Sequence, residues 1–248
     1  MLQSPASAAG AAAQTVGLML ADSRLPSGGH VSSSGLEPAL MAGMGRDQVG
    51  EYRRGRARTA ALTDAGAAVV IRHGFLEAGQ NKAGQNEPGQ SGGTQSSAEL
   101  LARTERAWAA RTPSRAARQI ASELGRGLLR LATSLWPDAA ALRQLGTAPS
   151  RPVVMGAVAA HAQLEAEELV RLVVYDDAAA AAAALLKLDP GDPAEAMSLV
   201  LQACASVEDR VAGVAALTEP ADIPASAAVQ MEDWIEHHAH TTRRLFRA

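Results

Sequence analysis

A helix break near the N-terminus constrains the fold of this chain more than any other feature. Ahead of the break, Val16, Met19 and Leu20 recur at the i, i+3 and i+4 spacing, which predicts one apolar helix face. Pro26 disfavours helical backbone in the residue before it. We therefore predict a first helix over residues 14–22 that ends before the proline.

The chain turns sharply after this proline and then starts a second helix. Gly28 and Gly29 can take left-handed backbone angles without steric cost, which favours a tight turn. Ser33 or Ser34 is suited to capping the next helix. A Ser34 cap would place Glu37 at the third helical position, as in a capping box.

The rest of the chain is predicted to be helical. No segment shows the alternation of apolar and polar residues that is typical of a half-buried strand. We predict an all-α fold, a single domain of about eight to ten packed helices. Thr63 and Asp64 are expected to cap a new helix within the predicted segment 46–78. The first of the remaining predicted segments starts at about residue 34 and the third at about residue 98. The others, in chain order, cover residues 46–78, 115–135, 152–160, 164–175, 178–188, 193–216 and about 224–246.

Two stretches are expected to lack fixed structure. Residues 1–13 consist mainly of Ala, Ser, Gly and Pro and read as a disordered lead-in to the helical domain, which spans residues 14–248. Residues 79–97 are rich in Gly, Gln, Asn and Ser, and cannot bury enough apolar surface to offset the entropy of ordering. We predict a flexible insertion there.

Composition excludes several classes of protein. A net charge of −3 argues against general binding to nucleic acids. The longest apolar run, residues 178–186, is too short to span a membrane, and the N-terminus lacks the pattern of a secretory signal. The single cysteine, Cys204, favours a reducing compartment. We expect a cytoplasmic protein with no membrane partner.

Motifs for catalysis are missing from the sequence. Neither lysine follows a glycine, so the P-loop pattern that binds nucleoside triphosphates does not occur. The chain also has no Gly-x-Ser-x-Gly elbow and no His-Glu-x-x-His motif. We predict that it is not an enzyme.

Three residues near the C-terminus are candidate metal ligands. Asp233 and His237 are four apart, and His237 and His240 are three apart, so each pair shares a helix face. Imidazole and carboxylate groups together suit Ni²⁺ or Zn²⁺. Two ligands on one exposed helix bind weakly without a third, and the alternative is a solvated helix end that contacts a partner.

Four motifs in order give the chain a resemblance to a known family. The first is Ala-Asp-Ser at 21–23 followed by Leu-Pro-Ser-Gly-Gly at 25–29 and Ser-Gly-Leu-Glu at 34–37. The others are Gly-Leu-Leu-Arg-Leu at 127–131, Pro-Val-Val-Met-Gly at 152–156 and Arg-Leu-Phe-Arg at 244–247. Together they resemble the UreF family of urease accessory proteins over residues 14–247.

The resemblance implies a non-enzymatic scaffold in the maturation of urease. Such a protein would bind a UreD/UreH-type accessory protein, recruit the UreG GTPase and assist nickel insertion into the urease apoprotein, as a homodimer. It would bind no cofactor directly, because nickel and GTP would act through the partners. The alternative is a nickel-binding metallochaperone that uses the C-terminal histidines.

The same resemblance points to two groups of partner-binding residues. One group lies around the first turn and the other in the C-terminal tail. They are Asp22, Pro26, Gly28, Gly29, His30, Gly35 and Glu37, and Arg243, Arg244, Leu245 and Phe246.

Overall fold

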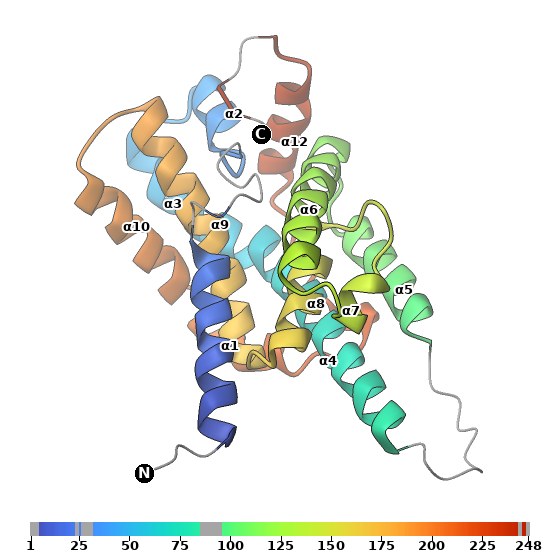
Figure 1. Ribbon diagram of the computed structural model, residues 1–248. Helices are drawn as coiled ribbons and strands as arrows, with labels where there is room; N and C mark the ends of the chain where they lie inside the picture. The colour runs from blue at the N-terminus through green and yellow to red at the C-terminus, as the bar shows by residue number, and fades with distance from the viewer. Residues whose placement is uncertain (1–4, 23–24, 26–31, 85–95, 243–244, 247–248) are drawn as a thin grey trace.

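The computed structural model describes residues 5–22, 25, 32–84, 96–242 and 245–246. These residues form an all-helical domain without a β-strand, which confirms the predicted fold class (Figure 1). The α-helices are α1 (Pro5–Ala21), α2 (Leu36–Met41), α3 (Val49–Arg56), α4 (Leu62–Gly84), α5 (Ser97–Ala110), α6 (Arg115–Leu135), α7 (Ala140–Arg143), α8 (Arg151–Ala162), α9 (Ala166–Leu188), α10 (Pro193–Ala205), α11 (Glu208–Ala215) and α12 (Val229–Ala239). Shorter helical turns are η2 (Arg46–Gln48), the π-helical η3 (Ala57–Ala61) and η4 (Pro220–Asp222).

The first helix is longer than predicted. Helix α1 begins at Pro5 and so includes residues 5–13, which we expected to be disordered. Alanine has the highest helix propensity, and proline is well suited to the first helical position. The alanine-rich sequence therefore extends the helix beyond the part that packs on the core.

Helices α3 and α4 form one continuous helical segment joined by η3. The predicted new helix start at Thr63 and Asp64 is wrong. Instead of capping, the Thr63 hydroxyl donates to the carbonyl of Thr59, 3.2 Å away, and lies 2.9 Å from the carbonyl of Pro224. A π-helical turn inserts one extra residue into the helix, and such turns often occur near functional sites.

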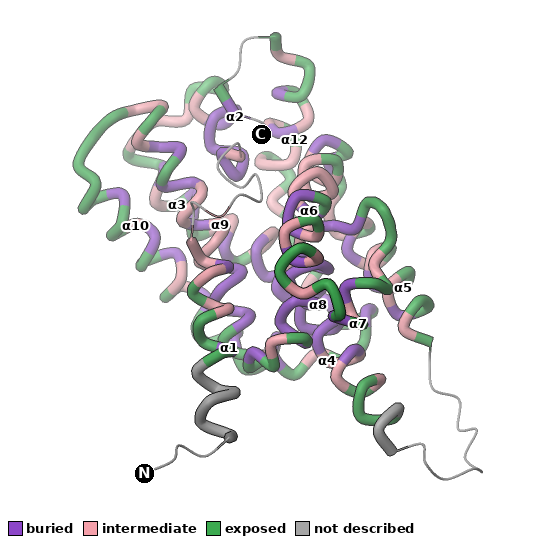
Figure 2. The backbone as a smooth tube through the Cα atoms, viewed as in Figure 1, coloured by how far each residue is buried: buried purple, intermediate pink, exposed green. Residues whose placement is uncertain are grey.

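The core lies where α4, α8 and α9 meet, and it is built mainly from alanine, valine and leucine (Figure 2). Val69 and Val154 are fully buried there. Helices α4 and α8 approach so closely that a Cβ atom on Gly156 would overlap the carbonyl oxygen of Ala68. Small side chains thus take the place of the aromatic residues that the sequence largely lacks.

Several predicted helix bounds need correction. Residues 164–175 and 178–188 belong to the single helix α9, whereas residues 193–216 are divided between α10 and α11. The final helix, α12, covers only Val229–Ala239 of the predicted 224–246. The predicted range of α6 is confirmed, with the Ser114 hydroxyl as the cap that accepts from the Ala117 N–H at 3.0 Å.

The predicted insertion at 79–97 is partly helical. Helix α4 continues to Gly84, and α5 begins at Ser97 after a cap by the Ser96 hydroxyl. Residues 85–95 lie outside the described part of the chain. Among the described residues, none of the helices is both long enough and apolar enough to cross a bilayer.

Candidate partner-docking site

A turn with two left-handed residues leads into α2. The backbone φ angle is +50° at Ser34 and +76° at Gly35. A Cβ atom at Gly35 would lie 2.7 Å from the Tyr52 hydroxyl oxygen and 3.1 Å from the Ile235 side chain. The Tyr52 hydroxyl donates a 2.9 Å hydrogen bond to the Ser34 carbonyl. The turn therefore needs a glycine and is held against α3.

Glu37 joins this turn to the C-terminal tail. Its carboxylate accepts hydrogen bonds from the backbone N–H groups of Leu245, at 2.6 Å, and Phe246, at 2.8 Å. The predicted capping box is wrong, because Ser33 rather than Ser34 supplies the hydroxyl that accepts from the Glu37 N–H, at 3.2 Å. The Glu37 side chain, only 5% exposed, faces a segment 208 residues away in sequence.

The end of the tail is an apolar anchor. Phe246 is 5% exposed, whereas the neighbouring Leu245 is 64% exposed. The Lys187 ammonium lies 5.2 Å from the centre of the Phe246 ring, within the range of a cation–π interaction. The ring joins an apolar cluster with Leu36, Ala39, Val49, Tyr52, Ala184 and Leu185.

His238 completes the surroundings of Glu37 and was not among the residues predicted from the sequence. Its Nε2 atom lies 3.3 Å from the Glu37 carboxylate, and its side chain is 1% exposed. Ile235, three residues earlier, is also buried. The i, i+3 spacing of these two residues is the signal that could have identified His238 as the inward-facing histidine of α12.

The candidate metal ligands lie elsewhere, on the solvent side of α12. His237 is exposed, with its Nδ1 atom 3.2 Å from the Asp233 carboxylate, and His240 at the end of the helix is exposed too. Within the described ranges, no three His, Cys, Asp or Glu residues are placed to hold a metal ion together. Among the described residues, Asp233 and His237 therefore have no third protein ligand with which to hold a metal ion.

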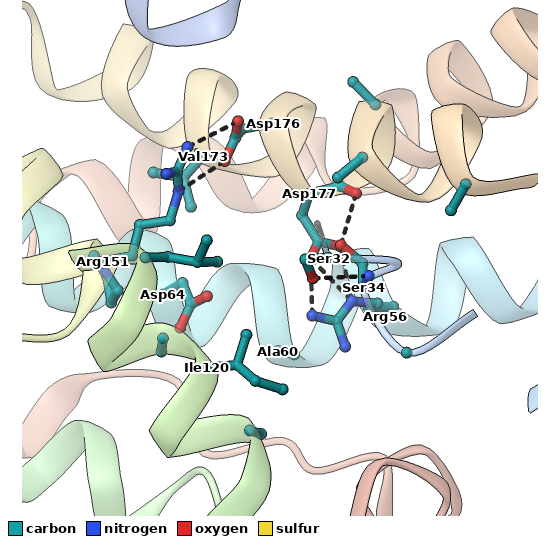
Figure 3. Close-up of a pocket in the computed structure, with 18 of the residues that line it drawn as sticks. Ser32, Ser34, Arg56, Ala60, Asp64, Ile120, Arg151, Val173, Asp176 and Asp177 are labelled. Carbon is teal, nitrogen blue, oxygen red and sulfur yellow. Dashed lines mark hydrogen bonds and ion pairs between the residues drawn. The ribbon is translucent and has the colours of Figure 1, made fainter. Parts of the chain in front are cut away.

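Next to the turn and the tail lies a groove of about 370 Å³. Three of the predicted partner-binding residues, Asp22, Gly35 and Phe246, line it. Helices α6, α9 and α12 contribute to its walls, with further residues from α3, α4 and α8. Figure 3 shows Ile120 of α6 and Asp64 of α4 near Arg151 of α8 and Asp176 of α9. The groove is thus bordered by the turn and the tail, the first and last of the four motifs that carry the family resemblance.

Two partly buried ion pairs line the groove. The Arg56 guanidinium donates to both oxygens of Asp177, with Nε–O distances of 2.9 and 3.0 Å. Arg151 binds Asp176 in the same two-pronged way, at distances from 2.9 to 3.1 Å. Bidentate guanidinium–carboxylate pairs fix the relative orientation of the two side chains as well as neutralising their charges. They therefore hold α3 and α8 in register with α9.

Asp64 is the unusual acid in this groove. Burial raises its pKa to about 7, and the charges of Asp177 and Glu232 also raise it. The Trp108 indole, which donates to Asp64 at 2.7 Å, and the guanidinium of Arg56 lower its pKa in part. The Asp64 carboxyl group therefore holds its proton to a much higher pH than an ordinary aspartate does.

Six of the predicted partner-binding residues fall outside the described part of the chain. They are Pro26, Gly28, Gly29, His30, Arg243 and Arg244.

Comparison with known proteins agrees with the motifs. The model of the UreF family matches residues 45–204. The urease accessory protein UreF of Mycobacterium sp. strain JLS is 38% identical over 213 residues, which cover 83% of this chain and 86% of the relative. That of Mycobacterium marinum is 33% identical over 235 residues, or 92% of this chain and 96% of the relative. That of Mycobacterium tuberculosis is 34% identical over 209 residues, or 82% and 88% of the two chains.

The family match covers well over half of the chain, and each of these relatives is aligned along most of its own length. The helical domain, the turn at Gly35 and the tail at Phe246 are therefore parts of a non-catalytic accessory protein. The chain belongs to the UreF family of urease accessory proteins.

Proposed function

We propose that this chain is a scaffold for nickel delivery to urease. It binds a UreD/UreH-type accessory protein, recruits the UreG GTPase and brings both to the urease apoprotein. The chain acts as a homodimer and works in the cytoplasm. Its role is positional, because the GTPase supplies the nucleotide chemistry and the partners carry the metal.

The observation that carries this proposal is the contact of Glu37 with the tail. The turn and the tail each resemble the family in sequence, and Glu37 holds them together through two backbone hydrogen bonds. Leu245 remains exposed beside the buried Phe246. This arrangement presents a composite surface to a partner while Phe246 anchors it to the domain.

A pull-down of the full chain with the other urease accessory proteins, with and without GTP and Ni²⁺, tests the proposal. Wild type should retain the UreD/UreH-type protein and, with it, the GTPase. Glu37→Ala leaves the N–H groups of Leu245 and Phe246 without their acceptor, so the yield of the complex should fall about tenfold.

Glu51→Ala is the matched control, because Glu51 is an exposed acid on the neighbouring α3. It should leave the yield unchanged. Failure of the wild-type chain to retain either accessory protein would contradict the proposed function. Light scattering of the purified chain tests the homodimer separately.

The contact between Asp233 and His237 supports the alternative of a nickel-binding metallochaperone. Equilibrium dialysis of the full chain with Ni²⁺ separates the two functions. Tight binding that disappears in a His237→Ala, His240→Ala double variant would favour the metallochaperone. Weak binding that the double variant leaves unchanged is the result expected of a scaffold.

A further inference from the structure

We propose that the groove between α6, α9 and α12 receives a segment of a partner protein, and that Asp64 binds a lysine or arginine side chain of that segment. The inference rests on the proposed scaffold function and assigns a specific role to one of its surfaces. It follows from the distribution of charge within the groove.

Two of the cationic side chains in the groove already face acids. Arg56 is paired with Asp177, and Arg151 with Asp176. All four side chains are well shielded from solvent, with exposed fractions between 11% and 28%. These two acids are therefore neutralised within the chain and offer little attraction to an incoming cation.

Three further charged side chains in the groove, Arg111, Lys187 and Glu232, also have defined contacts. Arg111 donates to three backbone carbonyl groups at 2.7 to 2.9 Å. Lys187 lies over the ring of Phe246. The Glu232 carboxylate accepts from the Ser114 N–H at 2.9 Å, at the N-terminus of α6 where the helix dipole favours negative charge.

Asp64 has no cationic hydrogen-bond partner of its own among the described residues, and the nearby Arg56 guanidinium is already bound to Asp177. The Oδ1 atom of Asp64 accepts one hydrogen bond, from the neutral indole of Trp108, and among the described residues its Oδ2 atom accepts none. The carboxyl group lies within the groove near Ile120 and Ala60 (Figure 3). An acid with a spare oxygen in a mostly apolar groove attracts a hydrogen-bond donor that carries positive charge.

The walls of the groove suit an extended side chain on a protein segment. On one side they consist largely of alanines of α9, including the exposed Ala183, so a backbone can approach closely. On the other side they include Ile120 and Leu124 of α6. The aliphatic stem of lysine or arginine can lie against such apolar walls while its charged end reaches Asp64.

Titration calorimetry of the full chain with the UreD/UreH-type protein tests this inference. A cation that docks on Asp64 ionises its carboxyl group and drives the proton into the buffer. With a pKa of about 7, binding at pH 7 should release about half a proton per chain, measured in buffers of different ionisation enthalpy. Asp64→Asn keeps an acceptor for Trp108 but should bind about tenfold more weakly and release no proton from this site.

Asp209→Asn, at an exposed acid of α11, is the matched charge control and should behave as wild type. Ala183→Trp should block the groove and weaken binding, whereas Ala212→Trp on the exposed face of α11 should not.

Equal affinity and equal proton release in wild type and Asp64→Asn would overturn the inference while leaving the scaffold function intact. Loss of self-association instead of partner binding in Asp64→Asn would assign the groove to a second copy of the chain and would also overturn it. Loss of all wild-type binding would instead contradict the scaffold function itself.

Discussion

At the scale of single residues, burial decides the chemistry of this molecule more than residue type does. His237, His238 and His240 stand close together in sequence, yet only His238 is buried against Glu37. Asp64 and Asp177 both line the groove, but Asp177 has a guanidinium partner and Asp64 has an indole. The sequence suggested His237 and His240 as metal ligands and Asp64 as a helix cap, and it singled out neither His238 nor Asp177, because the environments of all these residues come from distant elements.

Asp64 should make stability depend on pH. Its pKa in the folded chain, about 7, exceeds the ordinary value of 3.8, so folding takes up a proton between these pH values. The contribution of Asp64 to the free energy of unfolding is therefore fully favourable below about pH 4 and is lost as the pH rises through 7. Asp64→Asn should remove this loss and raise the free energy of unfolding at pH 8 by about 2 kcal/mol relative to wild type.

Urea denaturation at pH 5 and pH 8 measures this difference. Asp209→Asn, which alters an exposed acid, should follow the wild-type pH dependence. A wild-type pH dependence in Asp64→Asn would show that the carboxyl group does not titrate between these pH values.

Gly35 should be harder to replace than Gly43. Both have positive φ, +76° and +94°, but only Gly35 has side chains close to its missing Cβ atom. Gly43→Ala should cost about 1 kcal/mol of stability from backbone strain, and Gly35→Ala about 2–4 kcal/mol because the clash with Tyr52 adds to it. Thermal denaturation of both variants compares them directly, and equal costs would argue against a tight contact with Tyr52.

At the scale of helices, the sequence predicted where a helix ends better than whether a helix continues past a polar pair of residues. The predicted range of α6, residues 115–135, matches the structure, in which Ser114 caps its start and Pro137 lies just beyond its end. By contrast, α9 was divided at Asp176 and Asp177, residues that usually favour caps and turns. Their carboxylates bind Arg151 and Arg56 instead, so no capping competes with the helix.

The packing of α4 on α8 should depend on Gly156. A Cβ atom there would overlap the Ala68 carbonyl and lie 3.0 Å from the Cβ atom of Ile71. Gly156→Ala should therefore destabilise the fold by about 2–3 kcal/mol. Gly213→Ala on α11, where nothing lies within 4 Å, should stabilise it by about 0.5–1 kcal/mol through helix propensity.

Urea denaturation of the two variants should show shifts of opposite sign. A stabilising effect at Gly156 would mean that α4 and α8 can move apart without loss of packing.

At the scale of the whole molecule, the sequence predicted the fold class and the two candidate segments but not their contact. The motif around Glu37 and the tail at Phe246 are separated by almost the entire chain, so no local pattern relates them. Their meeting depends on how α2, α9 and α12 pack, which is set by many small side chains together. The groove and the role of Asp64 could not be predicted from the sequence for the same reason.

The segment between α4 and α5 should be dispensable for folding. Replacing residues 85–95 with a five-residue Gly/Ser linker keeps all of α4 and the Ser96 cap of α5. Because closure entropy varies slowly with loop length, the free energy of unfolding should change by less than about 1 kcal/mol. Circular dichroism during thermal denaturation measures it, and a large loss would show that the segment packs on the domain.

The hydrogen bond from Trp108 to Asp64 gives the molecule a built-in optical reporter. Indole emission responds to a nearby carboxyl group, and the chain has only three tryptophans, Trp108, Trp136 and Trp234. With Trp136 and Trp234 replaced by phenylalanine, the remaining fluorescence would follow the ionisation of Asp64 directly. Occupancy of the groove could then be watched in real time, without an attached dye.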